Sequence, residues 1–327
     1  MSNEKEHFYT GVRDPALEAL FARTLPQLAE DVRALNNRRL TGLWLGGGYG
    51  RGEGGAFYEE GKPPRPYNDI DLFVFTEDMD EDQKDDLEKS LKPIAEKYSA
   101  AFGASVDFCR PRNPPDYKKD EDRLMIQELK RGHVALLGGD GLLDHVRLLE
   151  AEELPRMEAM RLLMNRGMGL VFAAQKYHSL NVSEDRTFFI RNLNKAILGA
   201  GDAQLLAAGR YAWTLAERVA RLNDPDYEAA AAFKLRPSDV LAAPPAALWR
   251  RTRDYWRSTV RLVGFTERRS IRQMMRWIVR RRTLGLVGTL GQDCTERVLR
   301  RVSAVLMHDI DGCQLSPDLE QDWLTFN

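Results

Sequence analysis

Apolar residues recur every three or four positions over residues 15–36, which predicts an amphipathic helix with Asp14 as its N-cap. Two further stretches of helical spacing predict helices at 81–101 and at about 120–131. Short apolar runs bounded by glycine, proline or polar residues predict strands at 42–45, 70–75, 105–108 and 133–137. This order of elements predicts an α/β (α+β) domain with a small mixed sheet over residues 1–145.

From residue 146 onward the apolar spacing is helical, and no strand is predicted. The pattern predicts helices at 152–178, 186–199, 202–222, 246–262, 267–283 and 295–307. Asp202, which follows Gly199 and Gly201, is expected to be the N-cap of a new helix. The alanine- and proline-rich stretch 223–247 is expected to be an irregular connection. Residues 146–327 are therefore predicted to form an all-α domain.

The composition and charge agree with two globular domains. The chain has 327 residues, of which 43% are hydrophobic and 30% charged, which excludes a largely disordered protein. Residues 1–145 hold 20 basic and 28 acidic residues, and the remainder holds 28 basic and 21 acidic ones. An acidic half beside a basic half indicates either a cation site facing an anion site or two domains that dock.

The cysteines and the apolar runs indicate in which cellular compartment the protein is expected. The cysteines at 109, 294 and 313 show no paired spacing, so neither a disulfide framework nor a Cys-x-x-Cys zinc or redox site is predicted. The first ten residues lack the apolar core of a signal peptide, and no apolar run is long enough to cross a bilayer. We therefore expect a cytoplasmic protein with no membrane partner.

A glycine-rich segment at 46–55 separates the first two predicted strands and carries the most informative motif. The P-loop pattern fails, because the glycine that it requires at position 56 is an alanine. The glycines of the Rossmann pattern are present, but that pattern must lie at the start of a helix. The prolines at 63, 64 and 66 leave no room for such a helix before the next strand. What remains is a strand, a glycine turn and a second strand that opens with Asp69 and Asp71.

Three carboxylates are predicted to gather near this turn. Asp69 and Asp71 lie on one face of a strand because side chains alternate, and Asp107 lies in the middle of the third strand. Two unit charges about 4 Å apart repel by about 4 kcal/mol at an effective dielectric constant of about 20. Mg²⁺ with a phosphate-bearing substrate would offset this repulsion, and glycine N–H groups can closely approach phosphate oxygens.

The sequence GGYGRGE at 47–53, followed by NDIDL at 68–72, resembles the signature of the polymerase-β-type nucleotidyltransferase superfamily. Within it, the minimal and kanamycin-nucleotidyltransferase-like branch is the most similar. The resemblance covers about residues 15–140. It implies that Gly47 and Gly48 position a nucleoside triphosphate, and that Asp69, Asp71 and Asp107 bind two Mg²⁺ ions. It also implies transfer of a nucleoside monophosphate to an acceptor, with release of pyrophosphate.

Two basic residues are further candidates for the triphosphate site, with ATP the expected donor. Arg51 in the glycine turn is expected either to contact the phosphates or to pair with Glu53 or Asp78 on the surface. Lys195, one turn from Arg191 on an otherwise apolar helix, is expected either to reach the triphosphate, as second-domain lysines do in relatives, or to lie on a solvated face.

The acceptor stays open at this point. The resemblance favours a small hydroxylated molecule, while a protein hydroxyl or an RNA end fits the basic half. Residues 246–301 hold fifteen arginines and four acids with interleaved tryptophans, which indicates either RNA binding or a solvated helix-bundle surface. A regulator that binds nucleotide or nucleic acid without transferring a group is the alternative from a different functional class.

Overall fold

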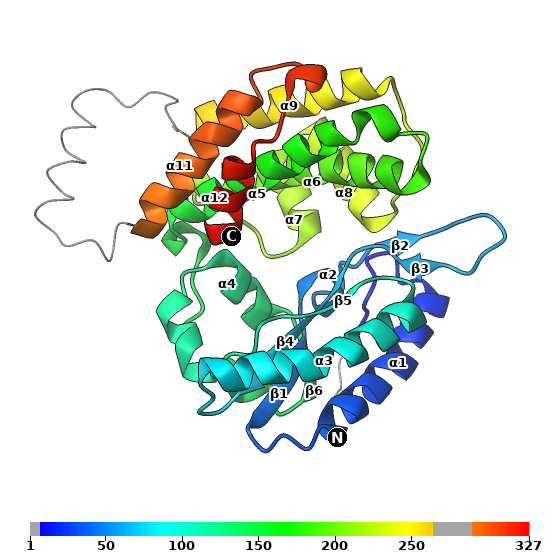
Figure 1. The fold of residues 1–327 in the computed structure, drawn as a ribbon, viewed down its shortest axis with the longest axis vertical. Helices are drawn as coiled ribbons and strands as arrows, with labels where there is room; N and C mark the ends of the chain where they lie inside the picture. Colours follow the sequence, from blue (N-terminus) through cyan, green and yellow to red (C-terminus); the bar gives the residue numbers. More distant parts are fainter. Residues whose placement is uncertain (1–6, 264–289, 327) are drawn as a thin grey trace, which may run out of the picture. The chain divides into compact units, whose positions relative to one another are not determined.

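The computed structural model describes residues 7–263 and 290–326, and their contacts divide the chain into two units (Figure 1). The first unit comprises Met1–Glu150 together with Ala232–Ser238, and the second comprises Ala151–Ala231 with Asp239–Asn327. The sequence predicted a division after residue 145 and gave no indication that 232–238 return to the first unit. The helix predicted at 267–283 lies outside the described residues.

A small mixed sheet forms the centre of the first unit. Its four strands are β1 (Leu40–Leu45), β4 (Ile70–Thr76), β5 (Val106–Phe108) and β6 (Val134–Leu137). They lie in the order β5-β4-β1-β6, with β4 parallel to β5 and β1 antiparallel to both of its neighbours. The loop between β1 and β4 contains a two-stranded hairpin of β2 (Ala56–Phe57) and β3 (Arg65–Pro66). The expected mixed α/β class is confirmed.

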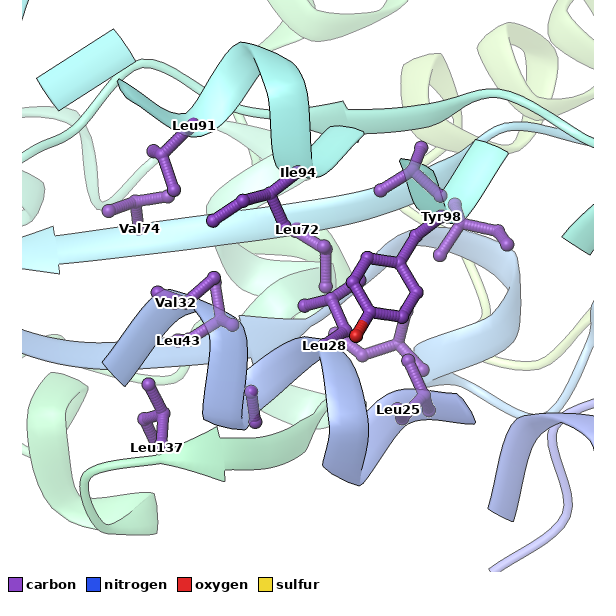
Figure 2. Packing of buried hydrophobic residues seen from close by; sticks show 14 of the residues in the cluster. Leu25, Leu28, Val32, Leu43, Leu72, Val74, Leu91, Ile94, Tyr98 and Leu137 are labelled. Carbon is purple, nitrogen blue, oxygen red and sulfur yellow. The ribbon is translucent and has the colours of Figure 1, made fainter. Parts of the chain in front are cut away.

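Side-chain alternation gives this sheet two buried faces. The helices of the unit are α1 (Pro15–Ala34), the single turn α2 (Gly47–Gly50), α3 (Glu81–Phe102) and α4 (Leu124–Arg131). One face packs Leu72 and Val74 against α1 and α3, as Figure 2 shows. The opposite face packs Trp44, Phe73 and Phe75 against α4. Full burial of each such side chain contributes about 1.5–3 kcal/mol, so both faces stabilise the sheet.

Polar residues at the ends of α1 and α3 fix where these helices begin. The Asp14 carboxylate accepts hydrogen bonds from the N–H groups of the first turn of α1, so the expected N-cap is confirmed. Asp80 and Gln83 form a reciprocal capping box at the start of α3. Gly103 ends α3 with a φ of +67°, a conformation that favours glycine. Each N-cap contributes about 1 kcal/mol.

The described part of the second unit is helical. Its helices are α5 (Arg156–Gln175), α6 (Ser183–Ala207), α7 (Leu215–Leu222), α8 (Pro225–Leu235, whose last residues belong to the first unit), α9 (Pro245–Leu262), α11 (Leu290–Val305) and α12 (Pro317–Phe326). Trp249 and Trp256 are fully buried, and their indole N–H groups donate to the carbonyls of Leu170 and Leu163 on α5. None of the helices described is long and apolar enough to span a membrane.

The helix break expected between residues 199 and 202 is absent, because α6 runs through both glycines. A Cβ at Gly199 would lie 2.4 Å from the Cγ of Arg166, and a Cβ at Gly201 would lie 2.2 Å from the ring of Tyr227. These glycines therefore serve close packing and do not end a helix. Asp202 is not an N-cap; its carboxylate accepts a 2.6 Å hydrogen bond from the Tyr227 hydroxyl.

The irregular connection expected at 223–247 is also wrong over part of its length. Helix α8 occupies residues 225–235 of it. Pro225 is the first helical residue, a position where the missing N–H of proline costs no hydrogen bond. Asp224 caps this helix, since its carboxylate accepts from the N–H groups of Asp226 and Tyr227. Prolines that indicated a loop here mark the start of a helix.

Candidate active site

The turn after β1 requires glycine at position 47. Gly46 donates a 2.9 Å backbone hydrogen bond to the carbonyl of Asp71, and the chain then makes the single turn α2. Gly47 has a φ of +60°, and a Cβ there would lie 2.0 Å from Oδ2 of Asp71. The absence of a side chain at this position lets the turn lie directly against the Asp71 carboxylate.

Position 48 is more permissive than position 47. A Cβ at Gly48 would lie 3.5 Å from the carbonyl oxygen of Glu53, an ordinary van der Waals distance. A serine would therefore fit there. The Glu53 N–H donates to the Gly48 carbonyl at 2.8 Å and closes the turn.

The pairing of β4 with β5 brings two of the predicted acids side by side. Asp71 and Asp107 are direct partners in the parallel register of these strands. Partnered side chains on neighbouring parallel strands point to the same face, so both carboxylates share the face of Phe73. Asp71 is half-buried and Asp107 is exposed, and Oδ1 of Asp107 accepts a 2.8 Å hydrogen bond from the Ser105 hydroxyl.

Cys109 lies near both carboxylates, and its titration reflects them. Burial, together with smaller contributions from the negative charges of Asp71 and Asp107, raises the pKa of the Cys109 thiol to about 12. The sequence analysis did not include Cys109 in the site. Its position two residues after Asp107 and directly past the end of β5 is the signal that could have identified it, because alternation continued one residue beyond the strand puts both residues on one face.

Asp69 lies just before β4, half-buried, and Tyr49 fixes the loop that leads to it. The Tyr49 hydroxyl donates to the carbonyl of Gly55 at 2.8 Å and accepts from the N–H groups of Tyr67 at 3.0 Å and Asn68 at 3.4 Å. Burial, with a smaller contribution from the Asp69 charge, raises the pKa of Tyr49. This tyrosine, which the sequence analysis also missed, ties the glycine turn to the entry of β4.

The acids offer the oxygen ligands that divalent cations prefer, and all three lie at one end of β4 and β5. Within residues 7–263 and 290–326, however, no three His, Cys, Asp or Glu side chains are arranged so that they could hold a metal ion. The residues thus fit a divalent cation in their chemistry and their strand positions. A closed set of three ligands is not assembled among the residues described.

Arg51 and Lys195, the two predicted phosphate contacts, have different surroundings. Arg51 pairs through Nη1 with Oε2 of Glu128 at 3.1 Å, and its Nε lies 3.8 Å from Oε2 of Glu53. The pairing with Glu53 was one of its two expected roles, and phosphate contact stays a prediction. Lys195 lies half-buried on α6 of the second unit, and its contact with a triphosphate also stays a prediction.

Many arginines of the 246–301 stretch that the structure describes are paired with acids of their own unit. Examples are Arg253 with Asp309 at 3.2 Å and Arg297 with Asp322 at 3.2 Å. Such pairs favour an ion-paired helix surface over a surface reserved for nucleic acid. Seven arginines of this stretch, from 268 to 282, lie outside the described residues.

Comparisons with known proteins found no matching family model, no similar curated protein and no similar solved structure. The motif and the geometry around it are therefore the features of this chain that bear on its function.

Proposed function

We propose that the first unit is the catalytic part of a metal-dependent nucleotidyltransferase that moves a nucleoside monophosphate from a nucleoside triphosphate to a hydroxyl acceptor. One observation carries this proposal. The side-chain-free turn at Gly47 lies against the carboxylate of Asp71, and Asp71 is in register with Asp107 on the neighbouring strand. A turn whose N–H groups can approach phosphate oxygens, beside paired carboxylates that can hold divalent cations, supports triphosphate chemistry at this site.

In the proposed reaction the acceptor oxygen attacks the α-phosphorus of the triphosphate. A new P–O bond forms while the bond to the bridging oxygen of the β-phosphate breaks; pyrophosphate leaves with that electron pair, and the proton of the acceptor hydroxyl passes to solvent water. Asp69, Asp71 and Asp107 would hold one Mg²⁺, and Asp69 and Asp71 would share a second. When bound, Mg²⁺ supplies positive charge that offsets the charge on the phosphates. The N–H groups of Gly47 and Gly48 would orient the triphosphate.

ATP is the proposed donor and a small hydroxylated molecule is the proposed acceptor. The ion pairs on the arginine-rich helices support this choice over an RNA acceptor, because carboxylates beside the guanidinium groups lower the positive charge that this surface offers to phosphates. Transfer to a protein hydroxyl remains the second acceptor class, and the same site would serve it.

Calorimetry with non-hydrolysable analogues of ATP, GTP, CTP and UTP, each with and without Mg²⁺, tests the proposal. We expect Mg²⁺-dependent binding of at least one analogue by the wild-type chain. Asp71→Asn should abolish that dependence while leaving the fold intact, since asparagine keeps the size of aspartate. Asp82→Asn, which removes an exposed acid from α3, is the matched control and should bind like the wild type.

Either of two results would overturn the proposal. If no analogue binds with Mg²⁺, or if Asp71→Asn binds the nucleotide–Mg²⁺ complex as tightly as Asp82→Asn, then the acids do not form a metal-dependent triphosphate site. Pyrophosphate release with a panel of hydroxyl acceptors would follow a positive binding result and identify the acceptor.

A further inference from the structure

The segment Ala232–Ser238 belongs to the first unit although the chain on both sides of it belongs to the second. Its residues contact the loop that continues from the glycine turn. The ring of Phe233 packs edge-on against Tyr67 at 5.9 Å, and the guanidinium of Arg236 lies 4.9 Å from the centre of the Tyr58 ring. Residues 232–238 therefore make specific contacts with the loop that follows the glycine turn of the candidate site.

Lys234 makes an ion pair within this contact. Its Nζ lies 3.1 Å from Oε2 of Glu53, a residue 181 positions earlier in the chain. The two side chains are only 18% and 12% exposed, so their attraction is weakly screened by water. A Cβ at Gly55 would lie 2.4 Å from the Lys234 carbonyl oxygen, so the backbones also meet closely.

Glu53 connects Lys234 to the turn itself. Its N–H closes the turn on the Gly48 carbonyl at 2.8 Å, and its carboxylate lies near Arg51, which in turn pairs with Glu128 on α4. The carboxylates of Glu53 and Glu128 thus alternate with the cations of Arg51 and Lys234. Removal of Lys234 takes a cation away from the carboxylate of Glu53, which is only 12% exposed and belongs to the residue that closes the turn.

We propose that Lys234 is a positioning residue that holds the glycine turn in its conformation through Glu53. The residue touches neither Gly47 nor Asp71; it acts through the carboxylate that it neutralises. The identity of the ligand of the turn, a nucleoside triphosphate, rests on the proposed function above, whereas the dependence of the turn on Lys234 does not.

Hydrogen exchange of the full-length chain tests this inference without any nucleotide. The N–H groups of residues 50–54 are hydrogen-bonded within the turn or to Tyr9, so their exchange reports turn opening. We expect exchange at these positions to be at least about tenfold faster in Lys234→Met than in the wild type, and to return towards the wild-type rate in Lys234→Arg.

Two further variants make the result specific. Lys84→Met removes a lysine that is 10% exposed and paired with Glu81 at 2.8 Å on α3, so it is the matched control and should leave the turn unchanged. Glu53→Gln should accelerate exchange as Lys234→Met does, and the double variant should add little beyond either one. If Lys234→Met does not fold, the exchange rates of Glu53→Gln test the inference in its place.

The inference is overturned if the turn exchanges at the wild-type rate in Lys234→Met and Glu53→Gln, or if exchange rises equally in α1 and α3. If the wild-type protein binds a nucleotide analogue, Lys234→Met should weaken that binding at least about tenfold, and Lys234→Arg should restore it. Failure of the wild type to bind any analogue would count against the proposed function, while the exchange data would still decide the role of Lys234.

Discussion

Replacement of Gly47 by alanine tests whether the turn must lie against Asp71. The new Cβ would lie 2.0 Å from Oδ2 of Asp71, in a residue held at a φ of +60°. The left-handed conformation costs a residue with a side chain about 1–2 kcal/mol. Overlap with Asp71 adds about 1–3 kcal/mol if the carboxylate keeps its place. We therefore expect Gly47→Ala to lower the free energy of opening of β4 and the turn by about 2–5 kcal/mol.

Gly48→Ala is the matched control for this substitution. Its Cβ would meet no atom nearer than the Glu53 carbonyl oxygen at 3.5 Å. Alanine is favoured over glycine in a helical turn by up to about 1 kcal/mol, so we expect no loss of stability. Gly48→Ser should be tolerated for the same steric reason.

Native-state hydrogen exchange of the β4 amides measures this opening free energy separately from the helical unit. If Asp71 avoids the clash by rotating away from the turn, the loss falls to about 1–2 kcal/mol and Gly47→Ala no longer binds nucleotide with Mg²⁺. Equal opening free energies and equal nucleotide binding in Gly47→Ala and Gly48→Ala would refute the reasoning, because the two variants would then be sterically equivalent.

Three further predictions concern charged and titratable groups. Asp202→Ala removes the carboxylate that pairs at 3.1 Å with the 3%-exposed Arg218, and should lower the free energy of urea unfolding of the second unit by about 3–5 kcal/mol; no change would contradict it. Hydrogen bonds from Lys84 and, next in size, from Arg110 lower the pKa of Glu81 from 4.5 to about 2, so the stabilisation by the Glu81 carboxylate is complete above pH 4.5 and is lost as the pH falls towards 2. Glu81→Gln should therefore reduce the loss of urea stability over that range, and an unchanged profile would contradict this. The Cys109 thiol, whose pKa burial and nearby carboxylates raise to about 12, should be alkylated at about pH 8 at least ~10-fold more slowly than a free thiol, as peptide mass spectrometry can measure.

The acids of the site could be predicted from the sequence because their placement depends on local rules. A short apolar run predicts β4, and alternation then fixes the face of Asp71. The register that pairs Asp71 with Asp107 is a longer-range property that the predicted strand bounds did not fix, because β5 begins at Val106 and not at residue 105. The need for glycine at position 47 was visible only as a motif, and the structure supplies its reason in the 2.0 Å approach to Asp71.

Other features depend on contacts that leave no local signal. Glycine propensity favoured a helix break near residue 201, but the helix continues through it, and the glycine is needed there because Tyr227 occupies the space that a side chain would take. The docking of Lys234 beside Glu53 joins residues 181 positions apart, within a stretch whose prolines and alanines indicated a loop. Tertiary packing determines the structure at these positions, and the spacing of apolar residues along the chain gives no sign of that packing.

A crystal of the full-length chain grown with Mn²⁺ in place of Mg²⁺ and a non-hydrolysable ATP analogue tests the central claim most directly. The anomalous signal of manganese locates the cation independently of the surrounding atoms. We predict a manganese peak between the carboxylates of Asp71 and Asp107, with triphosphate oxygens against the N–H groups of Gly47 and Gly48. A triphosphate bound elsewhere, or these carboxylates free of manganese while the analogue is bound, would contradict the account.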